Sequence, residues 1–212
     1  PVAALGRTGV GEAVQEGDEI PIFPLQTVLF PGGLLPLRIF ETRYLDMVGE
    51  CLREQKGFGV CSITAGTEVG RAAGCAAVGT LALIDDFGRS EDGMLSIVAR
   101  GARRFRMLQS RVQANQLVRA SVAWLDDSED APVPEQHRPM ATFLAQLIQR
   151  AGQPFTSLPA DFDSSAWVGG RLAELVPFAL ADKQRLLEMD SPLERLDVIY
   201  GELLAEELSH HR

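Results

Sequence analysis

Residues 20–44 read IPIFPLQTVLFPGGLLPLRIFETRY, and the rest of the chain can be placed around them. Two apolar runs, Ile20–Leu25 and Leu34–Phe40, flank a break at Pro31-Gly32-Gly33. The break predicts a loop, because proline fixes one backbone angle and glycine accepts conformations that other residues avoid. Two prolines inside the first run each remove a hydrogen-bond donor. That run therefore predicts a strand at a sheet edge or beside a local irregularity.

A helix is predicted directly after this stretch. Apolar residues recur there at helical spacing, and Glu41 lies near the helix start, where an acidic side chain is favourable. Gly57 predicts the end of this helix. The pattern beyond it indicates a compact β-barrel or rolled sheet with one helix inserted early, and with Phe23 and Phe40 in its core. The predicted strands cover residues 58–64, 76–84, 94–99, 103–112 and 117–124.

The composition changes at Asp126, where the acidic, proline-containing segment DDSEDAPVPE begins. Strand signals stop there, and apolar residues then recur at helical spacing. Near the end, Ser191-Pro192-Leu193-Glu194 supplies an N-cap, a proline in the first turn and a capping-box glutamate. We therefore expect an α+β fold with a flexible arm (1–18), a β-domain (19–126) and a helical bundle (127–212).

The bulk composition restricts the function. With 29 acidic and 20 basic residues the net charge is −9, which disfavours general affinity for nucleic acid. No apolar run is long enough to span a bilayer and no signal-peptide pattern is visible, so we expect a cytoplasmic protein. Cys51, Cys61 and Cys75 match no zinc or redox spacing and are expected to be reduced core residues.

The sequence offers little for catalysis. It has no G-x-x-x-x-G-K-[ST] loop for binding phosphates, and Lys183, one of only two lysines, is predicted to lie on a helix surface. His137 is predicted to be a solvated linker residue, and the acids at residues 85–92 are predicted to solvate a turn. We therefore expect no enzyme activity, no cofactor and no metal site.

Three blocks of sequence carry a resemblance. They are IFPL (22–25) with FPG (30–32) and LPLRIFE (35–41), then GTLA (79–82) with GMLSIVARG (93–101), and LVPF (175–178) with KQRLLE (183–188). In this order they resemble the Lon protease N-terminal (substrate-binding) domain family. The resemblance implies a PUA-like β pseudo-barrel followed by a helical bundle. It also implies a stand-alone protein, because no ATPase or protease domain follows in this sequence.

The resemblance further implies a non-catalytic, ATP-independent module that recognises unfolded or degron-bearing polypeptide, or that serves as an adaptor to a protease. We expect the peptide to bind at residues 26–35, by strand addition or apolar contact, because proline-interrupted strands leave backbone groups unpaired. The candidate contact residues are Gln26, Phe30, Pro31, Leu34 and Leu35, and Phe30 is expected to be exposed with this loop.

An RNA-binding module is the alternative. PUA-like folds elsewhere bind RNA, and Arg100, Arg103, Arg104 and Arg106 form a basic cluster in this sequence. No platform of alternating exposed aromatic residues accompanies the cluster, so ion pairing with nearby acids explains it better. An unrecognised hydrolase ranks third.

Overall fold

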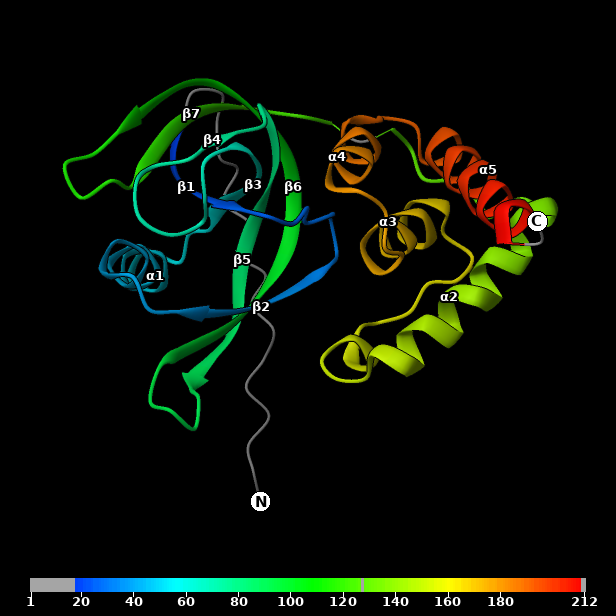
Figure 1. Cartoon of the computed structure of the whole chain (residues 1–212), viewed down its shortest axis with the longest axis horizontal. Coiled ribbons are helices and arrows are strands. Elements are labelled where there is room, and N and C mark those ends of the chain that lie inside the picture. Colours follow the sequence, from blue (N-terminus) through cyan, green and yellow to red (C-terminus); the bar gives the residue numbers. More distant parts are fainter. Residues whose placement is uncertain (1–17, 127, 211–212) are drawn as a thin grey trace.

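Our computed structural model describes residues 18–126 and 128–210, with side chains up to Ala205. A β half and a helical half lie side by side (Figure 1). In the β half, β1 (Glu19–Leu25) pairs antiparallel with β7 (Val118–Trp124) and parallel with β3 (Phe58–Ala65). β5 (Val78–Arg89) pairs with β3 and with β6 (Leu95–Val112), which in turn pairs with β7. These strands therefore close into a ring, and all its pairings except β1 with β3 are antiparallel.

Two short strands extend the ring. β2 (Leu34–Ile39) pairs with the first part of β6, and β4 (Gly74–Cys75) pairs with the end of β3. Within the described residues β2 has no second strand partner, so it is an edge strand. Pro36 lies in the middle of β2 and suits that position, because proline cannot donate to a further ladder.

Helix α1 (Thr42–Glu54) follows β2 directly. Its buried face joins an apolar cluster with residues of β1, β3, β5 and β6, and each fully buried side chain of this kind stabilises the fold by roughly 1.5–3 kcal/mol. The helix ends before Gln55, which adopts a left-handed φ of 54°, and not at Gly57 as predicted. Gly57 instead allows a close approach to β5, since a Cβ there would lie 2.5 Å from the Ala82 carbonyl oxygen.

The helical half contains four α-helices and two short 3-10 turns within the described residues. They are η1 (Glu135–His137), α2 (Arg138–Ala151), η2 (Phe155–Ser157), α3 (Ser165–Leu175), α4 (Leu180–Glu188) and α5 (Pro192–His210). The predicted cap of the last helix is confirmed, because the Glu194 N–H donates to Ser191 Oγ at 3.3 Å. The Trp167 N–H likewise donates to Ser164 Oγ at 2.9 Å and caps α3. None of the described helices is long and apolar enough to cross a membrane.

The predicted α+β class is confirmed at the level of a largely antiparallel sheet followed by helices. The PUA-like and bundle assignments and the domain division near residue 126 remain predictions, and residues 1–17 of the predicted arm lie outside the described residues. The predicted strands 94–99 and 103–112 form one continuous strand, β6. Gly101, which lies between the two predicted strands, lets β6 pass closely over the Phe30 carbonyl, since a Cβ would lie 2.2 Å from that oxygen.

Candidate functional site

The loop between β1 and β2 was predicted to bind peptide, but its centre joins the two halves of the molecule. Phe30 was expected to be exposed, yet it is fully buried in the apolar cluster of the helical half. Its N–H donates to Glu174 Oε1 at 2.9 Å, and the Pro31 carbonyl accepts from Arg171 Nη2 at 3.0 Å. The expected exposure of Phe30 is therefore wrong. The local sequence shows an apolar loop but does not show the surface of α3 that covers it.

The other predicted contact residues differ in their surroundings. Gln26 is exposed, and its N–H donates to Glu68 Oε1 on the loop at residues 66–73. Leu34 and Leu35 are half-buried at the start of β2. The five residues therefore do not form one exposed patch, and peptide binding by them stays a prediction.

A cluster of charged groups holds the joint between the halves. Arg171 Nε donates to Glu174 Oε2 at 2.8 Å, and Lys183 Nζ donates to the Glu174 carbonyl at 2.7 Å. Burial raises the pKa of the Glu174 carboxyl, and the charge of Arg171 partly offsets this. Burial lowers the pKa of Lys183, which is half-buried in this joint and is not the surface residue that was predicted.

Gly33 makes room for the Glu174 carboxylate. A Cβ at position 33 would lie 1.9 Å from Glu174 Oε1, which is far inside contact distance. The glycine predicted to permit a turn is therefore also required for the approach of α3 to the loop.

Three of the four arginines in the predicted basic cluster form ion pairs with acidic residues. Arg104 is fully buried and pairs with Asp190 at 2.9 Å, next to the end of α4. Two neighbours form ion pairs on the surface, Arg100 with Asp85 at 2.7 Å and Arg103 with Asp126 at 3.3 Å. Ion pairing, the explanation favoured from the sequence, is confirmed for these three arginines. Nothing in the described structure supports the RNA-binding alternative.

His137 is buried, which corrects the prediction of a solvated linker residue. Its Nε2 lies 2.5 Å from Asp197 Oδ1 on α5, and its ring packs edge-on against Tyr200 with centroids 5.1 Å apart. Among the described residues no serine side chain hydrogen-bonds to it, so the pair packs η1 against α5 and does not form a catalytic triad. Its polar sequence neighbours gave no sign of this burial.

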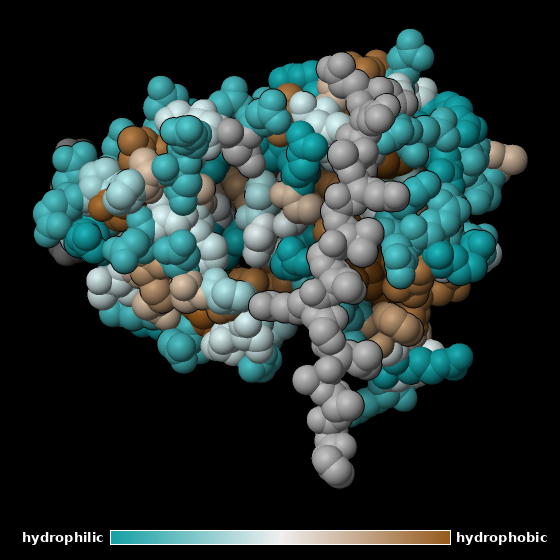
Figure 2. All heavy atoms as spheres, turned by 180° about the vertical axis from the view of Figure 1, so that it is seen from behind, coloured by the Kyte–Doolittle hydropathy of each residue, from teal (hydrophilic) through white to brown (hydrophobic). Residues whose placement is uncertain are grey.

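An apolar groove lies on the β half beside the edge strand β2. Its volume is about 90 Å³, and its floor contains the stacked rings of Phe23 and Tyr44, with centroids 3.9 Å apart. The remaining lining residues are Leu25, Leu37, Arg38, Ile39, Phe40, Glu41, Glu68 and Val69. Phe40 and Val69 are 57% and 54% exposed. Figure 2 shows the molecule from the side opposite to that of Figure 1. On this face hydrophilic residues dominate, and the hydrophobic surface is confined to separate patches.

The exposure of Phe40 corrects its predicted place in the core, whereas the predicted burial of Phe23 is confirmed. Phe40 follows the last residue of β2, and Ile39 is the neighbour that is buried. Successive side chains of extended backbone point to opposite sides, so burial of Ile39 directs Phe40 outward.

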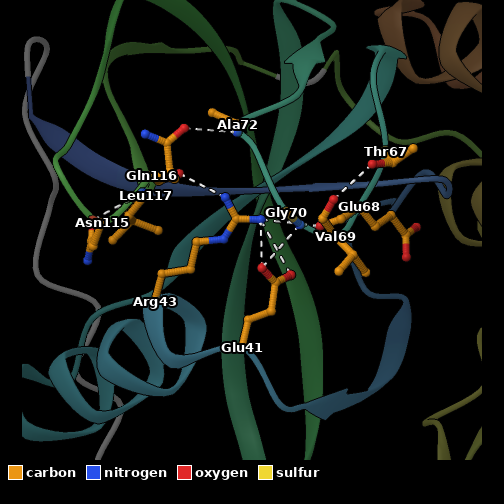
Figure 3. A network of polar contacts seen from close by, with 10 residues as sticks. All are labelled: Glu41, Arg43, Thr67, Glu68, Val69, Gly70, Ala72, Asn115, Gln116 and Leu117. Carbon is orange, nitrogen blue, oxygen red and sulfur yellow. Dashed lines mark hydrogen bonds and ion pairs between the residues drawn. The ribbon is translucent and has the colours of Figure 1, made fainter.

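Arg43 is the centre of a polar network behind the groove (Figure 3). Its Nη1 donates to the Gln116 carbonyl at 3.0 Å, and its Nη2 donates to the Glu68 carbonyl at 3.4 Å. Glu41 forms an ion pair with Arg43 at 3.1 Å. The start of α1, the turn between β6 and β7 and the loop at residues 66–73 are therefore fixed to one buried guanidinium.

The loop at residues 66–73 carries Val69 to the groove. Gly66 and Gly70 both have φ of 95°, a left-handed conformation that glycine adopts at little cost. The Gly70 N–H donates to Glu41 Oε2 at 3.3 Å, and Thr67 Oγ1 donates to the Val69 carbonyl at 2.8 Å. These contacts hold the exposed Val69 side chain against the groove.

Burial raises the pKa of Tyr44, on the groove floor, to about 12. The charge of Arg43 opposes this increase, while those of Glu41 and Glu68 add to it. The phenol therefore keeps its proton throughout the neutral range.

A second hollow, of about 220 Å³, lies on the hairpin formed by β5 and β6. Its lining is largely polar, with Asp86, Arg89, Ser90 and Ser96 among its residues. The groove beside β2 combines two exposed apolar side chains with a free strand edge, so it is the better candidate for an apolar ligand. No group of three or more His, Cys, Asp or Glu side chains that could hold a metal ion occurs among the described residues.

The sequence analysis missed Glu68 and Val69, because the segment that contains them is polar and rich in glycine. The available signal was a single apolar residue, Val69, between Gly66 and Gly70. Loops carry a disproportionate share of binding residues, which makes Val69 a candidate contact.

Comparisons with known proteins agree with this fold. A family profile of the ATP-dependent protease La (LON) substrate-binding domain matches residues 19–205. A solved Lon N-terminal domain protein from Xanthomonas campestris is 39% identical with a TM-score of 0.70, and the match covers 89% of this chain and 98% of that one. The N-terminal domain of the Mycobacterium avium complex Lon protease is 17% identical with a TM-score of 0.58, and the match covers 86% of this chain and 96% of that one. The two proteins therefore share the fold.

Curated relatives are much longer than the matched region. The Lon protease of Anaeromyxobacter dehalogenans is 28% identical over 178 residues, which are 80% of this chain and 21% of that protein. Lon protease 2 of Myxococcus xanthus gives the same identity and the same coverage. The chain thus spans about a fifth of the length of these relatives. Because the family profile covers most of it, the chain belongs to the substrate-binding domain family of the ATP-dependent protease La (Lon).

Proposed function

We propose that this chain recognises unfolded or degron-bearing polypeptide, without ATP and without catalysing a reaction on it. Membership of a substrate-binding domain family supports recognition of protein substrates, because the profile that matches the chain describes a substrate-binding domain. Delivery of the bound polypeptide to a protease, as an adaptor, is part of the same proposal. The PUA-like assignment of the β half remains an expectation from the resemblance.

The observation that carries the proposal is the apolar groove beside a free strand edge. An extended polypeptide can pair with the backbone of β2 on either side of Pro36, which has no N–H to donate, while one of its side chains enters between Phe40 and Val69. Covering roughly 100 Å² of apolar surface would contribute about 2.5 kcal/mol before the costs of association. Recognition of this kind requires an extended, accessible chain, which folded proteins rarely offer.

The predicted contact residues divide between two roles in this proposal. Gln26 hydrogen-bonds to Glu68, which lines the groove, and Leu34 and Leu35 belong to β2, which borders it. These three residues therefore remain candidate contacts. Phe30 and Pro31 contact α3 in the joint. They would affect polypeptide binding only indirectly, by holding the loop in position.

Binding of one protein in two states tests the proposal. Fluorescently labelled α-lactalbumin would be offered to the full chain in its native form and in a reduced, carboxymethylated form that stays unfolded. We expect the fluorescence anisotropy to rise only with the unfolded form, and the binding to persist at about 0.5 M salt, because apolar contacts are not screened. Binding of the native form alone, or of neither form, contradicts the proposal.

A further inference from the structure

We propose that the groove selects polypeptide segments in which a bulky apolar side chain lies next to a lysine or an arginine. The apolar side chain occupies the space between Phe40 and Val69, and the cation pairs with Glu68 on the rim. This inference rests on the proposed function, since it names the class of segment that the same groove takes.

Glu68 lies in a fixed position on the rim. Its backbone carbonyl accepts from Arg43, and one of its carboxylate oxygens accepts the Gln26 N–H. Both contacts leave the negative charge of the carboxylate in place, because one involves the backbone and the other a neutral donor. No lysine or arginine side chain in the part of the chain that the structure describes forms an ion pair with it.

The other charged residues of the groove are paired. Glu41 forms its ion pair with Arg43, and Arg38 forms one with Asp92 on the hairpin. The lining therefore combines apolar walls with one uncompensated carboxylate, that of Glu68. A ligand that is apolar at one residue and cationic at the next matches both features.

The pKa of Tyr44 agrees with a position of the Glu68 carboxylate close to the floor of the groove. Burial is the main reason that the pKa of its phenol is raised, but Glu41 and Glu68 also contribute against the opposing charge of Arg43. The carboxylate of Glu68 is therefore close enough to act on a group at the floor, where the guest side chain would lie.

The expected preference is modest. An exposed ion pair changes an equilibrium constant about twofold to fivefold. The net charge of −9 adds a long-range attraction for basic segments, and salt suppresses both effects. Apolar contact would therefore supply most of the affinity, and Glu68 would supply the preference among apolar segments.

Three labelled peptides test the inference. They share a central Phe-Leu pair and differ only in the residues beside it, which are lysine, glutamine or glutamate. We expect the dissociation constant to increase in that order, by about twofold to fivefold for each step at low salt, and the differences to shrink at about 0.5 M salt. Glu68→Gln should reduce the preference for lysine to the part that the net charge of the protein supplies, while its amide oxygen can still accept the Gln26 N–H.

Glu91→Gln is the matched control, because Glu91 is an exposed acid outside the groove and the variant has the same net charge as Glu68→Gln. It should keep the preference for lysine. Equal binding of all three peptides, or a preference for lysine as large in Glu68→Gln as in Glu91→Gln, overturns the inference and leaves the proposed function standing. Absence of binding to all three overturns both. Self-association that disappears in Phe40→Ser would show that a second copy occupies the groove, which also overturns the inference.

Discussion

The Phe30 N–H donates a 2.9 Å hydrogen bond to the Glu174 carboxylate, joining residues 144 positions apart in the chain. This contact places the centre of the loop between β1 and β2 in the joint with α3. The two ends of the loop lead to the groove, where Leu25 and Leu37 form part of the lining. The joint and the groove are thus separate features, and substitutions can test them separately.

Phe30→Ala should destabilise the protein without changing what it binds. Replacing a fully buried phenylalanine by alanine typically costs about 3–5 kcal/mol of unfolding free energy, because it leaves a cavity. Urea unfolding measures the loss, and anisotropy with unfolded α-lactalbumin measures the affinity of the molecules that stay folded. A variant of normal stability that no longer binds would place Phe30 in the binding site and contradict the assignment made here.

Gly33→Ala should break the joint. The added Cβ would lie 1.9 Å from Glu174 Oε1, so the carboxylate must move and release the Phe30 N–H. We expect a loss of about 1–3 kcal/mol, the cost of an unsatisfied buried donor. Gly49→Ala in α1 is the control, because its Cβ meets nothing within 4 Å and the helix should gain about 0.5–1 kcal/mol. Equal effects of the two substitutions on urea unfolding would contradict this account of the joint.

The carboxyl of Glu174 should make stability depend on pH. Its folded-state pKa is raised above the ordinary value of 4.5, chiefly by burial. A group of this kind contributes stability that is complete below its unfolded-state pKa and is lost as the pH rises through its folded-state pKa. The unfolding free energy of the wild type, relative to that of Glu174→Gln, should therefore fall as the pH rises above about 4.5. Urea unfolding of both proteins at several pH values checks this, and a difference that stays flat or rises with pH contradicts it.

Arg104→Met should destabilise the fold strongly. The buried guanidinium donates to the Leu187 carbonyl at 2.8 Å and pairs with Asp190, so its loss leaves acceptors at the end of α4 unpaired. A buried carbonyl left without its donor costs about 1–3 kcal/mol, whereas the Asp190 side chain is 70% exposed and water can solvate it. Arg106→Met, two residues away and exposed, should change the unfolding free energy by less than about 0.5 kcal/mol. Similar stabilities of the two variants would show that Arg104 is not a structural residue.

Phe30 and Phe40 show how far the sequence could predict this fold and its site. The proline and glycine break, the helix after it and the order of strands before helices follow from local patterns, and they were predicted correctly. The burial of Phe30 depends on α3, which lies far along the chain, and no local pattern contains that contact. Phe40 continues an apolar run, but the alternation of extended backbone exposes it once Ile39 is buried.

The groove itself could not be predicted, because residues from separate elements form it. Phe23, Phe40 and Val69 come from β1, the end of β2 and the loop at residues 66–73. Arg43 brings that loop to the start of α1 through a hydrogen bond to the Glu68 backbone carbonyl, and any residue can supply such a carbonyl. The sequence therefore indicates the separate elements that line the groove, but it does not show that they lie next to one another in the fold.

The affinity of Phe40→Ser for unfolded, carboxymethylated α-lactalbumin, compared with that of Phe87→Ser, tests the central claim most directly. The two phenylalanines are 57% and 59% exposed, and only Phe40 lines the groove, so both substitutions should preserve the fold. We predict that Phe40→Ser weakens binding about tenfold, which corresponds to about 1.4 kcal/mol, while Phe87→Ser binds like the wild type. Equal affinities of the two variants would contradict the claim that this groove recognises polypeptide.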